Sequence, residues 1–409
     1  MSALSASALA GAATVVSQPR RRRVPHRAVR ALLATVTAAT VAVGLLPAPS
    51  QAQGLPGSIS PEQIANGALG TISPESLSQL LYFGTLPGSS GSSMMGVANR
   101  LGFTPDMFAG SPPPAPQPNP LITETEVVAR DVDGRYERWL IDSADMKRGI
   151  TVEVYRATTP DAPFLYLLDG VGSELPSGFM QWGAAEQFAD QNVNLVIPTG
   201  GQGSMWADWN EQDPVLGISK WESFITRDLP NLLEPEVSTN RNRGIGGISM
   251  GAGAALTMAT RHPDLYKAVF GVSGCYSTDA LGQILTRYTV ESRGATLTNM
   301  WGEPGNEQWA AHDAMVGAEN LRGKAIYLSS GTGVAGPGDW EDYDNDAANF
   351  VAGMALEQAT GQCTRAADRR LRALGIPARI DHLPTGMHNW SYFSQQIPVA
   401  WNAVRGALR

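Results

Sequence analysis

Short apolar runs recur along the chain from residue 121 onward, and helix-like segments separate several of them. Continuous apolar runs of about four to eight residues are typical of strands that are buried on both faces of a sheet. The first three runs form an early β region, and the later ones have the buried pattern. Strands are therefore predicted at 123–130, 135–141, 150–156, 164–168, 193–198, 243–248, 268–273, 325–329 and 378–383.

Helices are predicted between these strands, at 179–190, 220–234, 250–261 and 346–372, the last interrupted near Gly361. Short apolar strands that alternate with helices indicate a mostly parallel sheet with helices on both faces, the α/β class. Segment 276–322 has little strand pattern and is interpreted as an inserted, cap-like segment over the site. The globular part, 121–409, is long enough for one large core.

The amino-terminal region differs from the rest of the chain. Arginines at 20–23, 27 and 30 precede a mostly apolar run at 31–46, which is short for a membrane span, and Ser50-Gln51-Ala52 resembles a cleavage site. We interpret 1–52 as a signal peptide, with an uncleaved anchor as the alternative. Residues 53–120 are a Ser/Gly/Pro-rich extension and linker, with two possible short helices and a proline-rich end.

Charge and cysteine content narrow the function classes. Removal of 1–52, which contain six arginines and no acids, lowers the formal charge from −8 to −14. An exported protein this acidic is a poor nucleic-acid binder. No CxxC motif or histidine-rich cluster indicates a metal, and we expect no cofactor. Cys275 and Cys363, the two cysteines, form either one disulfide or two buried thiols.

Gly247-Ile248-Ser249-Met250-Gly251 closes a predicted strand and opens a helix rich in small residues. A serine on a tight strand-to-helix turn between glycines is the pattern of a nucleophile elbow. The pattern predicts acyl transfer through an ester on Ser249.

A serine alcohol needs a base to take its proton. After residue 52 the chain has four histidines. His262 ends the helix after the serine and is expected to cap it, His312 is expected to be structural, and His382 falls inside a strand. His388 follows the last strand in a loop, where open α/β sheets place working groups. We predict His388 as the base.

A carboxylate between Ser249 and His388 would complete the hydrolase order. Glu357 stands alone on an otherwise apolar helix surface and therefore needs a partner such as an imidazolium. The charge-dense segment at 339–346 is instead interpreted as a solvated or ion-binding loop. Its acidic residues remain open as candidates: Asp339, Glu341, Asp342, Asp344 and Asp346.

The oxyanion of the reaction needs two backbone N–H donors. Met250, directly after the serine, is one candidate. Val171, between two glycines in the loop after an early strand, is the other. Asp169 in the same loop is either a turn former or an acceptor for the hydroxyls of a polyol substrate.

Seven short motifs, in this order and at similar spacing, resemble the antigen 85 mycolyltransferase family, whose members are esterase-type α/β hydrolases of mycolic-acid bacteria. The resemblance covers residues from about 121 to the end. The motifs are Leu167-Leu168-Asp169-Gly170, Pro198-Thr199-Gly200-Gly201-Gln202, Asp208-Trp209, Lys220-Trp221-Glu222, Gly247-Ile248-Ser249-Met250 and Met300-Trp301-Gly302, together with His388-Asn389-Trp390.

The resemblance implies an α/β-hydrolase fold and a role for each matching residue. It makes Ser249 the nucleophile, Glu357 the acid and His388 the base, although another register would put Ala352 at the acid position. It makes Val171 and Met250 oxyanion donors and Asp169 a trehalose contact. Trp390 and the cap-like segment are expected to help position the acceptor.

The implied activity is transfer of a mycoloyl group from trehalose monomycolate to trehalose or an arabinogalactan-type glycan at the cell envelope. A secreted carboxylesterase and a non-catalytic surface binding protein are the alternatives. Gly172 replaces the trehalose-binding arginine of the family, which leaves the acceptor open. A Cys275–Cys363 disulfide would hold the helix of Glu357 in place.

Overall fold

The computed structural model describes residues 116–344 and 347–409. The predicted signal peptide and almost all of the predicted extension lie outside these residues. Within the described part, nine strands form one sheet in the order β1-β2-β3-β5-β4-β6-β7-β8-β9. The strands are β1 (Glu126–Asp133), β2 (Tyr136–Ser143), β3 (Arg148–Tyr155), β4 (Ala162–Leu168), β5 (Asn194–Pro198), β6 (Thr239–Ile248), β7 (Ala268–Val272), β8 (Ala325–Ser330) and β9 (Arg379–His382).

Each predicted strand is present, with its ends shifted by a few residues. The early strands β1, β2, β3 and β5 pair antiparallel, whereas β5, β4, β6, β7, β8 and β9 pair parallel. Strands β4, β5 and β7 are buried at every residue, as their continuous apolar sequences predict. The predicted mostly parallel sheet is confirmed.

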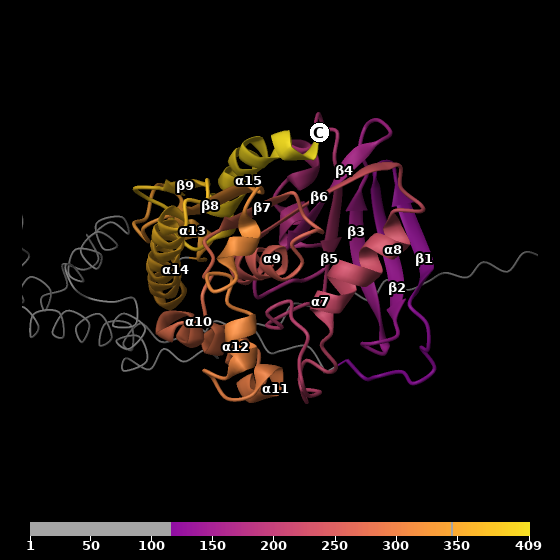
Figure 1. Cartoon of the computed structure of the whole chain (residues 1–409), viewed down its shortest axis with the longest axis horizontal. Helices are drawn as coiled ribbons and strands as arrows, with labels where there is room; N and C mark the ends of the chain where they lie inside the picture. The colour runs from indigo at the N-terminus through magenta and orange to yellow at the C-terminus, as the bar shows by residue number, and fades with distance from the viewer. Residues whose placement is uncertain (1–115, 345–346) are drawn as a thin grey trace, which may run out of the picture. The chain divides into compact units, whose positions relative to one another are not determined.

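Helices cover both faces of the sheet (Figure 1). One face packs against α8 (Leu229–Leu233), α9 (Met250–Arg261) and α14 (Ala347–Ala373). The other packs against α5 (Gly178–Gln181), α6 (Ala184–Gln187) and α15 (Trp390–Val404). None of the helices in the described part has the length and apolarity that a bilayer span requires.

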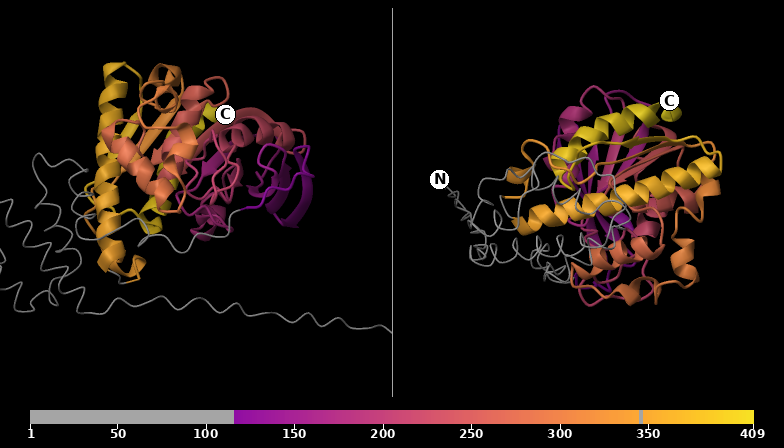
Figure 2. Two further views of the ribbon diagram at one scale, coloured as in Figure 1. Left: turned by 90° about the horizontal axis from the view of Figure 1, so that it is seen from below. Right: turned by 90° about the vertical axis from the view of Figure 1, so that its left-hand side faces the viewer.

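Two helix predictions need correction. The predicted break near Gly361 is wrong, because α14 continues through this position as one long helix (Figure 2). A Cβ on Gly361 would lie 3.1 Å from the Gly331 oxygen, so the glycine allows the helix to approach the end of β8 rather than ending the helix. The predicted helix at 179–190 is divided into α5 and α6 by Gly183, which has a φ of 87°.

The segment predicted at 220–234 contains α7 (Trp221–Ser223), a π-helical turn (Phe224–Asp228) and α8. The wider turn precedes Pro230, which lacks an N–H for a helical hydrogen bond.

Segment 276–322 contains helices, as its lack of strand pattern suggests. They are α10 (Ala280–Glu291), α11 (Leu297–Trp301), α12 (Glu307–Ala311) and a 3₁₀ turn (Ala318–Leu321). Buried Met300, Trp301 and Trp309 form a small core together with Trp209 from outside the segment. Helices α10, α11 and α12 lie at one end of the sheet (Figure 1), while Ala314, Ala318 and Leu321 join the segment to the main core.

Candidate active site

Ser249 lies on the turn between β6 and α9, at the carboxyl end of a central strand. Its φ of 53° and ψ of −119° are unfavourable for a residue with a side chain and cost about 1–3 kcal/mol. The Ser249 N–H donates to the Val272 carbonyl at 2.9 Å, which anchors the turn to the neighbouring strand β7. The strained turn lifts the hydroxyl away from the sheet, as the elbow pattern predicts.

The two glycines of the elbow have no room for a side chain. A Cβ on Gly251 would lie 2.0 Å from the Leu168 oxygen, and a Cβ on Gly247 would lie 2.4 Å from the Gly251 carbonyl carbon. The absence of these side chains brings the start of α9 against the end of β4. The loop after β4 therefore lies beside Ser249.

His388 joins Ser249 to Glu357. Its Nε2 is 2.8 Å from Ser249 Oγ, and its Nδ1 is 2.8 Å from Glu357 Oε2. A carboxylate at Nδ1 favours the tautomer with a proton there, which leaves Nε2 free to accept the serine proton. His382 takes no part in these hydrogen bonds: it lies on β9, with its Nε2 3.4 Å from Asp368.

Glu357 is fully buried on α14. Its Oε1 accepts hydrogen bonds from Ser273 Oγ at 2.7 Å and from the Gly331 N–H at 2.6 Å, while Oε2 faces the imidazole. These donors satisfy the buried carboxylate and keep it in one fixed orientation. The contact favours the register with Glu357, rather than Ala352, at the acid position.

The acidic segment around Asp339 supports the histidine loop instead of competing for the imidazole. The Asn389 amide donates to Asp339 at 2.7 Å and to Asp342 at 3.3 Å, and the Tyr343 hydroxyl donates to the His388 carbonyl at 2.8 Å. Asp339 is buried, so its interpretation as a solvated loop residue is wrong. These contacts link the short helix α13 (Asp339–Asp342) to the backbone of His388.

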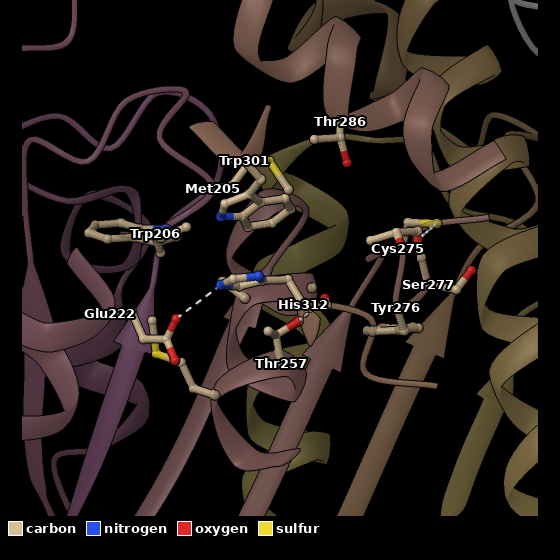
Figure 3. A pocket seen from close by; sticks show the side chains of 15 residues that line it. Met205, Trp206, Glu222, Thr257, Cys275, Tyr276, Ser277, Thr286, Trp301 and His312 are labelled. Carbon is tan, nitrogen blue, oxygen red and sulfur yellow. Dashed lines mark hydrogen bonds and ion pairs between the residues drawn. The ribbon is translucent and has the colours of Figure 1, made fainter. Parts of the chain in front are cut away.

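Glu222 is another buried carboxylate, and Figure 3 shows it facing His312. His262 lies against the same carboxylate. His262 Nε2 lies 2.8 Å and His312 Nε2 3.5 Å from the carboxylate, and Arg261 Nε donates to it at 2.7 Å. Burial raises the pKa of Glu222, but hydrogen bonds from these three residues outweigh it and hold the pKa well below its usual range. His312 also stacks on Trp301, with ring centroids 4.1 Å apart.

This cluster joins α7, the end of α9 and α12, and it borders a cavity of only about 40 Å³. The structural interpretation of His312 agrees with these contacts. His262 does not cap its helix through the imidazole, which turns to Glu222 because a charged acceptor is a stronger partner than a carbonyl.

A cavity of about 330 Å³ opens beside Ser249 and His388. The loop after β4 lines one side, including Asp169 and Val171, and Trp390 lines another. Among the described residues, none that lines it comes from 276–322, so this segment does not cover the cavity as expected.

The positions of the predicted oxyanion donors are compatible with that role. Met250 is the first residue of α9, and the first N–H groups of a helix have no acceptor within the helix. Val171 follows Gly170, where a Cβ would lie only 3.5 Å from the Ser249 Cβ. Both backbones therefore lie next to the serine.

Asp169 is buried, and both of its carboxylate oxygens accept backbone hydrogen bonds. The Gly170 N–H donates to Oδ1 at 2.8 Å, and the Gly178 N–H donates to Oδ2 at 2.7 Å. Burial raises the pKa of Asp169 to about 6, although these two hydrogen bonds act in the opposite direction. The contacts give Asp169 a turn-forming role and leave it on the cavity wall.

Trp390 and Gly172 define the rest of this wall. The Trp390 ring packs edge-on against Phe179 at 5.4 Å and covers Gly178, where a Cβ would lie 1.9 Å from the ring. A Cβ on Gly172 would have no atom within 4 Å. The position where the related family has an arginine is therefore open space.

The structure contains the predicted disulfide between Cys275 and Cys363. Cys363 lies on α14, one and a half turns after Glu357, and Cys275 follows Ser273, which donates to the same carboxylate. The supporting roles of Ser273 and Tyr343 were not predicted. The position of Ser273 directly after β7 is the one sequence signal that could have indicated its role. In the described residues, no group of three or more acidic, histidine or cysteine side chains has a metal-binding arrangement.

The chain is similar in sequence to known acyltransferases. The Esterase family model matches residues 143–403. The diacylglycerol acyltransferase/mycolyltransferase Ag85B of Mycolicibacterium smegmatis is 30% identical over 281 residues, which cover 64% of this chain and 82% of that protein. The corresponding Ag85A of Mycobacterium ulcerans is 27% identical over 288 residues, which cover 66% of this chain and 79% of the relative.

Solved structures share the fold at lower identity. The crystal structure of Mycobacterium tuberculosis MPT51 (FbpC1) has a TM-score of 0.57 and 22% identity, and the match covers 68% of this chain and all of that one. An S-formylglutathione hydrolase from Agrobacterium tumefaciens has a TM-score of 0.52 and 14% identity over 69% of this chain and all of that one. From the sequence matches and this fold, the chain belongs to the esterase family of α/β hydrolases that contains the antigen 85 mycolyltransferases.

Proposed function

We propose that the protein is an exported serine acyltransferase that moves a mycoloyl group from trehalose monomycolate to trehalose or a cell-wall glycan. The relatives support an esterase- or mycolyltransferase-type function. The choice of donor and acceptor, and the role of each residue, are part of the proposal.

The observation that carries the proposal is the continuous hydrogen-bonded chain from Glu357 through His388 to Ser249. Both contacts of the imidazole are 2.8 Å long, and the serine end opens into a cavity of about 330 Å³. A serine, an imidazole and a buried carboxylate in this order can deprotonate an alcohol at neutral pH.

In the first half-reaction, His388 Nε2 takes the proton of Ser249 as Oγ attacks the ester carbonyl carbon of the donor. The tetrahedral intermediate collapses when the carbon–oxygen bond to the sugar breaks, and the departing sugar oxygen receives the proton from Nε2. The mycoloyl group remains as an ester on Ser249. The Glu357 carboxylate, which lies against Nδ1, stabilises the transient imidazolium.

The N–H groups of Val171 and Met250 stabilise the negative oxygen of the intermediate. Each donor at such a position contributes about 3–4 kcal/mol to transition-state stabilisation in serine enzymes. In the second half-reaction an acceptor hydroxyl gives its proton to Nε2 and attacks the same carbon, and Ser249 Oγ recovers the proton. Transfer exceeds hydrolysis when the acceptor is held in place better than water.

Two features of the chain support export. The basic segment and apolar run within 1–52 have the pattern of a signal peptide. The disulfide between Cys275 and Cys363 belongs to an oxidising compartment.

A secreted carboxylesterase is the second candidate. The open space at Gly172 favours it, because a sugar that is held by fewer groups competes less well with water.

The deciding experiment incubates wild type and Ser249→Ala with trehalose monomycolate, with and without added trehalose or glycan acceptor. Trehalose dimycolate from the wild type alone supports transfer, whereas free mycolate as the sole product supports the esterase. Equal product from both proteins contradicts a role for Ser249.

A further inference from the structure

A second, larger cavity of about 730 Å³ lies on the other side of the Ser173–Glu174 segment from the Ser249 cavity. Its volume is within the range of small-molecule sites. Strand β3, the loop after β5 and the loop after α10 contribute to its lining. The lining includes two arginines and a carboxylate, Arg148, Arg293 and Glu174, together with the side chains of Thr199, Gln202 and Trp221.

Arg148 brings a positive charge that the described residues do not neutralise. Its Nη1 donates to the Leu216 carbonyl at 3.1 Å, and its guanidinium lies 5.6 Å from the centre of the Trp221 ring. Its Nε is buried without a hydrogen-bond acceptor, and it forms no ion pair within 116–344 and 347–409. Burial lowers the pKa of Arg148 to about 10.

Arg293 is in the same situation. Its side chain crosses Gly203, where a Cβ would lie 2.7 Å from the arginine Cγ, and its Nε is also buried without an acceptor. Burial lowers the pKa of Arg293, and the charge of exposed Glu174 acts in the opposite direction. No carboxylate in the described part of the chain forms an ion pair with it.

The wall between the two cavities is held rigidly. Ser173 accepts hydrogen bonds from Gly200 N–H at its carbonyl (2.8 Å) and from Gly201 N–H at its hydroxyl oxygen (3.1 Å). Thr199, directly before these glycines, donates from Oγ1 to the Thr151 carbonyl at 2.8 Å, which ties the same loop to β3. A preformed wall lowers the entropic cost of binding a ligand.

We infer that this cavity binds an acidic sugar, that is, a hydroxyl-rich ligand with a carboxylate or phosphate group. Two partly buried guanidinium groups that line the cavity and have no carboxylate partner in the described residues favour an anion, because planar guanidinium forks match carboxylate and phosphate oxygens. The hydroxyl and amide groups of Thr199 and Gln202 suit sugar hydroxyls. The site does not include Ser249 and does not depend on the proposed acyl transfer.

Calorimetric titration of the full chain with glucuronate, glucose 6-phosphate and glucose tests the inference. We expect at least one acidic sugar to bind ten-fold or more tightly than glucose, and to bind more weakly at high salt. Comparison of the two acidic sugars distinguishes a carboxylate from a phosphate ligand. Equal binding of all three sugars, or no binding, overturns the inference.

Matched variants locate the site. Arg293→Met is expected to lose the preference for acidic sugars by ten-fold or more, whereas Arg287→Met is expected to keep it, because Arg287 is exposed and paired with Glu291. Glu174→Gln removes the opposing charge and is expected to tighten binding several-fold. Unchanged binding by Arg293→Met, with normal hydrolysis of a small ester, contradicts the assignment. If Arg293→Met does not fold, Glu174→Gln decides the test: a variant that binds acidic sugars no more tightly than the wild type also contradicts the assignment.

Discussion

Replacement of both cysteines by serine is expected to lower stability and to disturb the candidate active site. The Cys275–Cys363 bond links residues 88 positions apart and connects the loop after β7 to α14. The same two elements hold Glu357: α14 carries it, and Ser273 in the loop donates to it at 2.7 Å. Loss of the disulfide is therefore expected to raise the conformational entropy of the unfolded chain and to loosen the position of the Glu357 carboxylate.

The size of the effect follows from loop closure. For a loop set by a separation of 88 residues, the chain-entropy relation yields about 4.6 kcal/mol at 25 °C. Measured losses are commonly about 2–4 kcal/mol, because unfolded chains retain structure. In a domain of this size, such a loss corresponds to a decrease of about 3–7 °C in the unfolding temperature.

Thermal unfolding, followed by circular dichroism, compares the wild type, the double serine variant and the reduced wild type. Reduction is expected to bring the wild type to the unfolding temperature of the variant and to leave the variant unchanged. The rate of hydrolysis of a small ester is measured well below the unfolding temperature. This rate is expected to fall further in the double serine variant than in a variant with an exposed residue replaced.

Two results would refute this reasoning. One is an unfolding temperature of the double variant within about 2 °C of the wild type, which is less than the smallest expected loss. The other is mass spectrometry of the exported, unreduced protein that detects two free thiols by alkylation.

Three further predictions follow from individual contacts. Glu357→Gln is expected to lower kcat for ester cleavage by about 10³–10⁴, because an amide cannot stabilise the imidazolium; a loss below ten-fold would place the acid elsewhere. Gly251→Ala is expected to prevent stable folding, because its Cβ would lie 2.0 Å from the Leu168 oxygen. Gly172→Ala is expected to keep the wild-type unfolding temperature, because its Cβ would have no atom within 4 Å. Thermal denaturation that shows the same effect for both variants would contradict this prediction. Folded Asp169, with its pKa raised by burial to about 6, binds its proton more tightly than the unfolded chain, so its contribution to stability is present below about pH 4 and is lost toward pH 6. Urea unfolding from pH 4 to 7 is expected to show this decrease, about 3 kcal/mol, in the wild type and not in Asp169→Asn.

Several features could be predicted from the sequence because they depend on local patterns. Apolar runs such as that of β4, buried at every position, identify strands without knowledge of their neighbours. The elbow at Ser249 was also recognisable, since a tight turn between glycines is a local requirement. Local patterns failed at Gly361, where close packing against Gly331, and not a helix end, explains the glycine.

The choice of acid shows where local patterns end. Glu357 and the acids around Asp339 were all compatible with the order of residues. The isolated position of Glu357 on an apolar helix surface made it a candidate, and the family resemblance then favoured it. In the structure, His388 contacts Glu357, which is buried and accepts two hydrogen bonds from separate strand ends, while Asp339 binds Asn389. The difference comes from contacts between distant segments, which no local pattern contains.

The sequence by itself therefore determined the strands, the mostly parallel α/β arrangement, the nucleophile elbow and the expectation of a histidine after the last strand. Only the tertiary structure decided how the imidazole of His388 is held, which carboxylate it meets, and that Arg148 and Arg293 share a cavity. The physical reason is range: backbone conformation and apolar periodicity act between near neighbours in the chain. A site, in contrast, depends on the burial and orientation of side chains that folding brings together from distant positions.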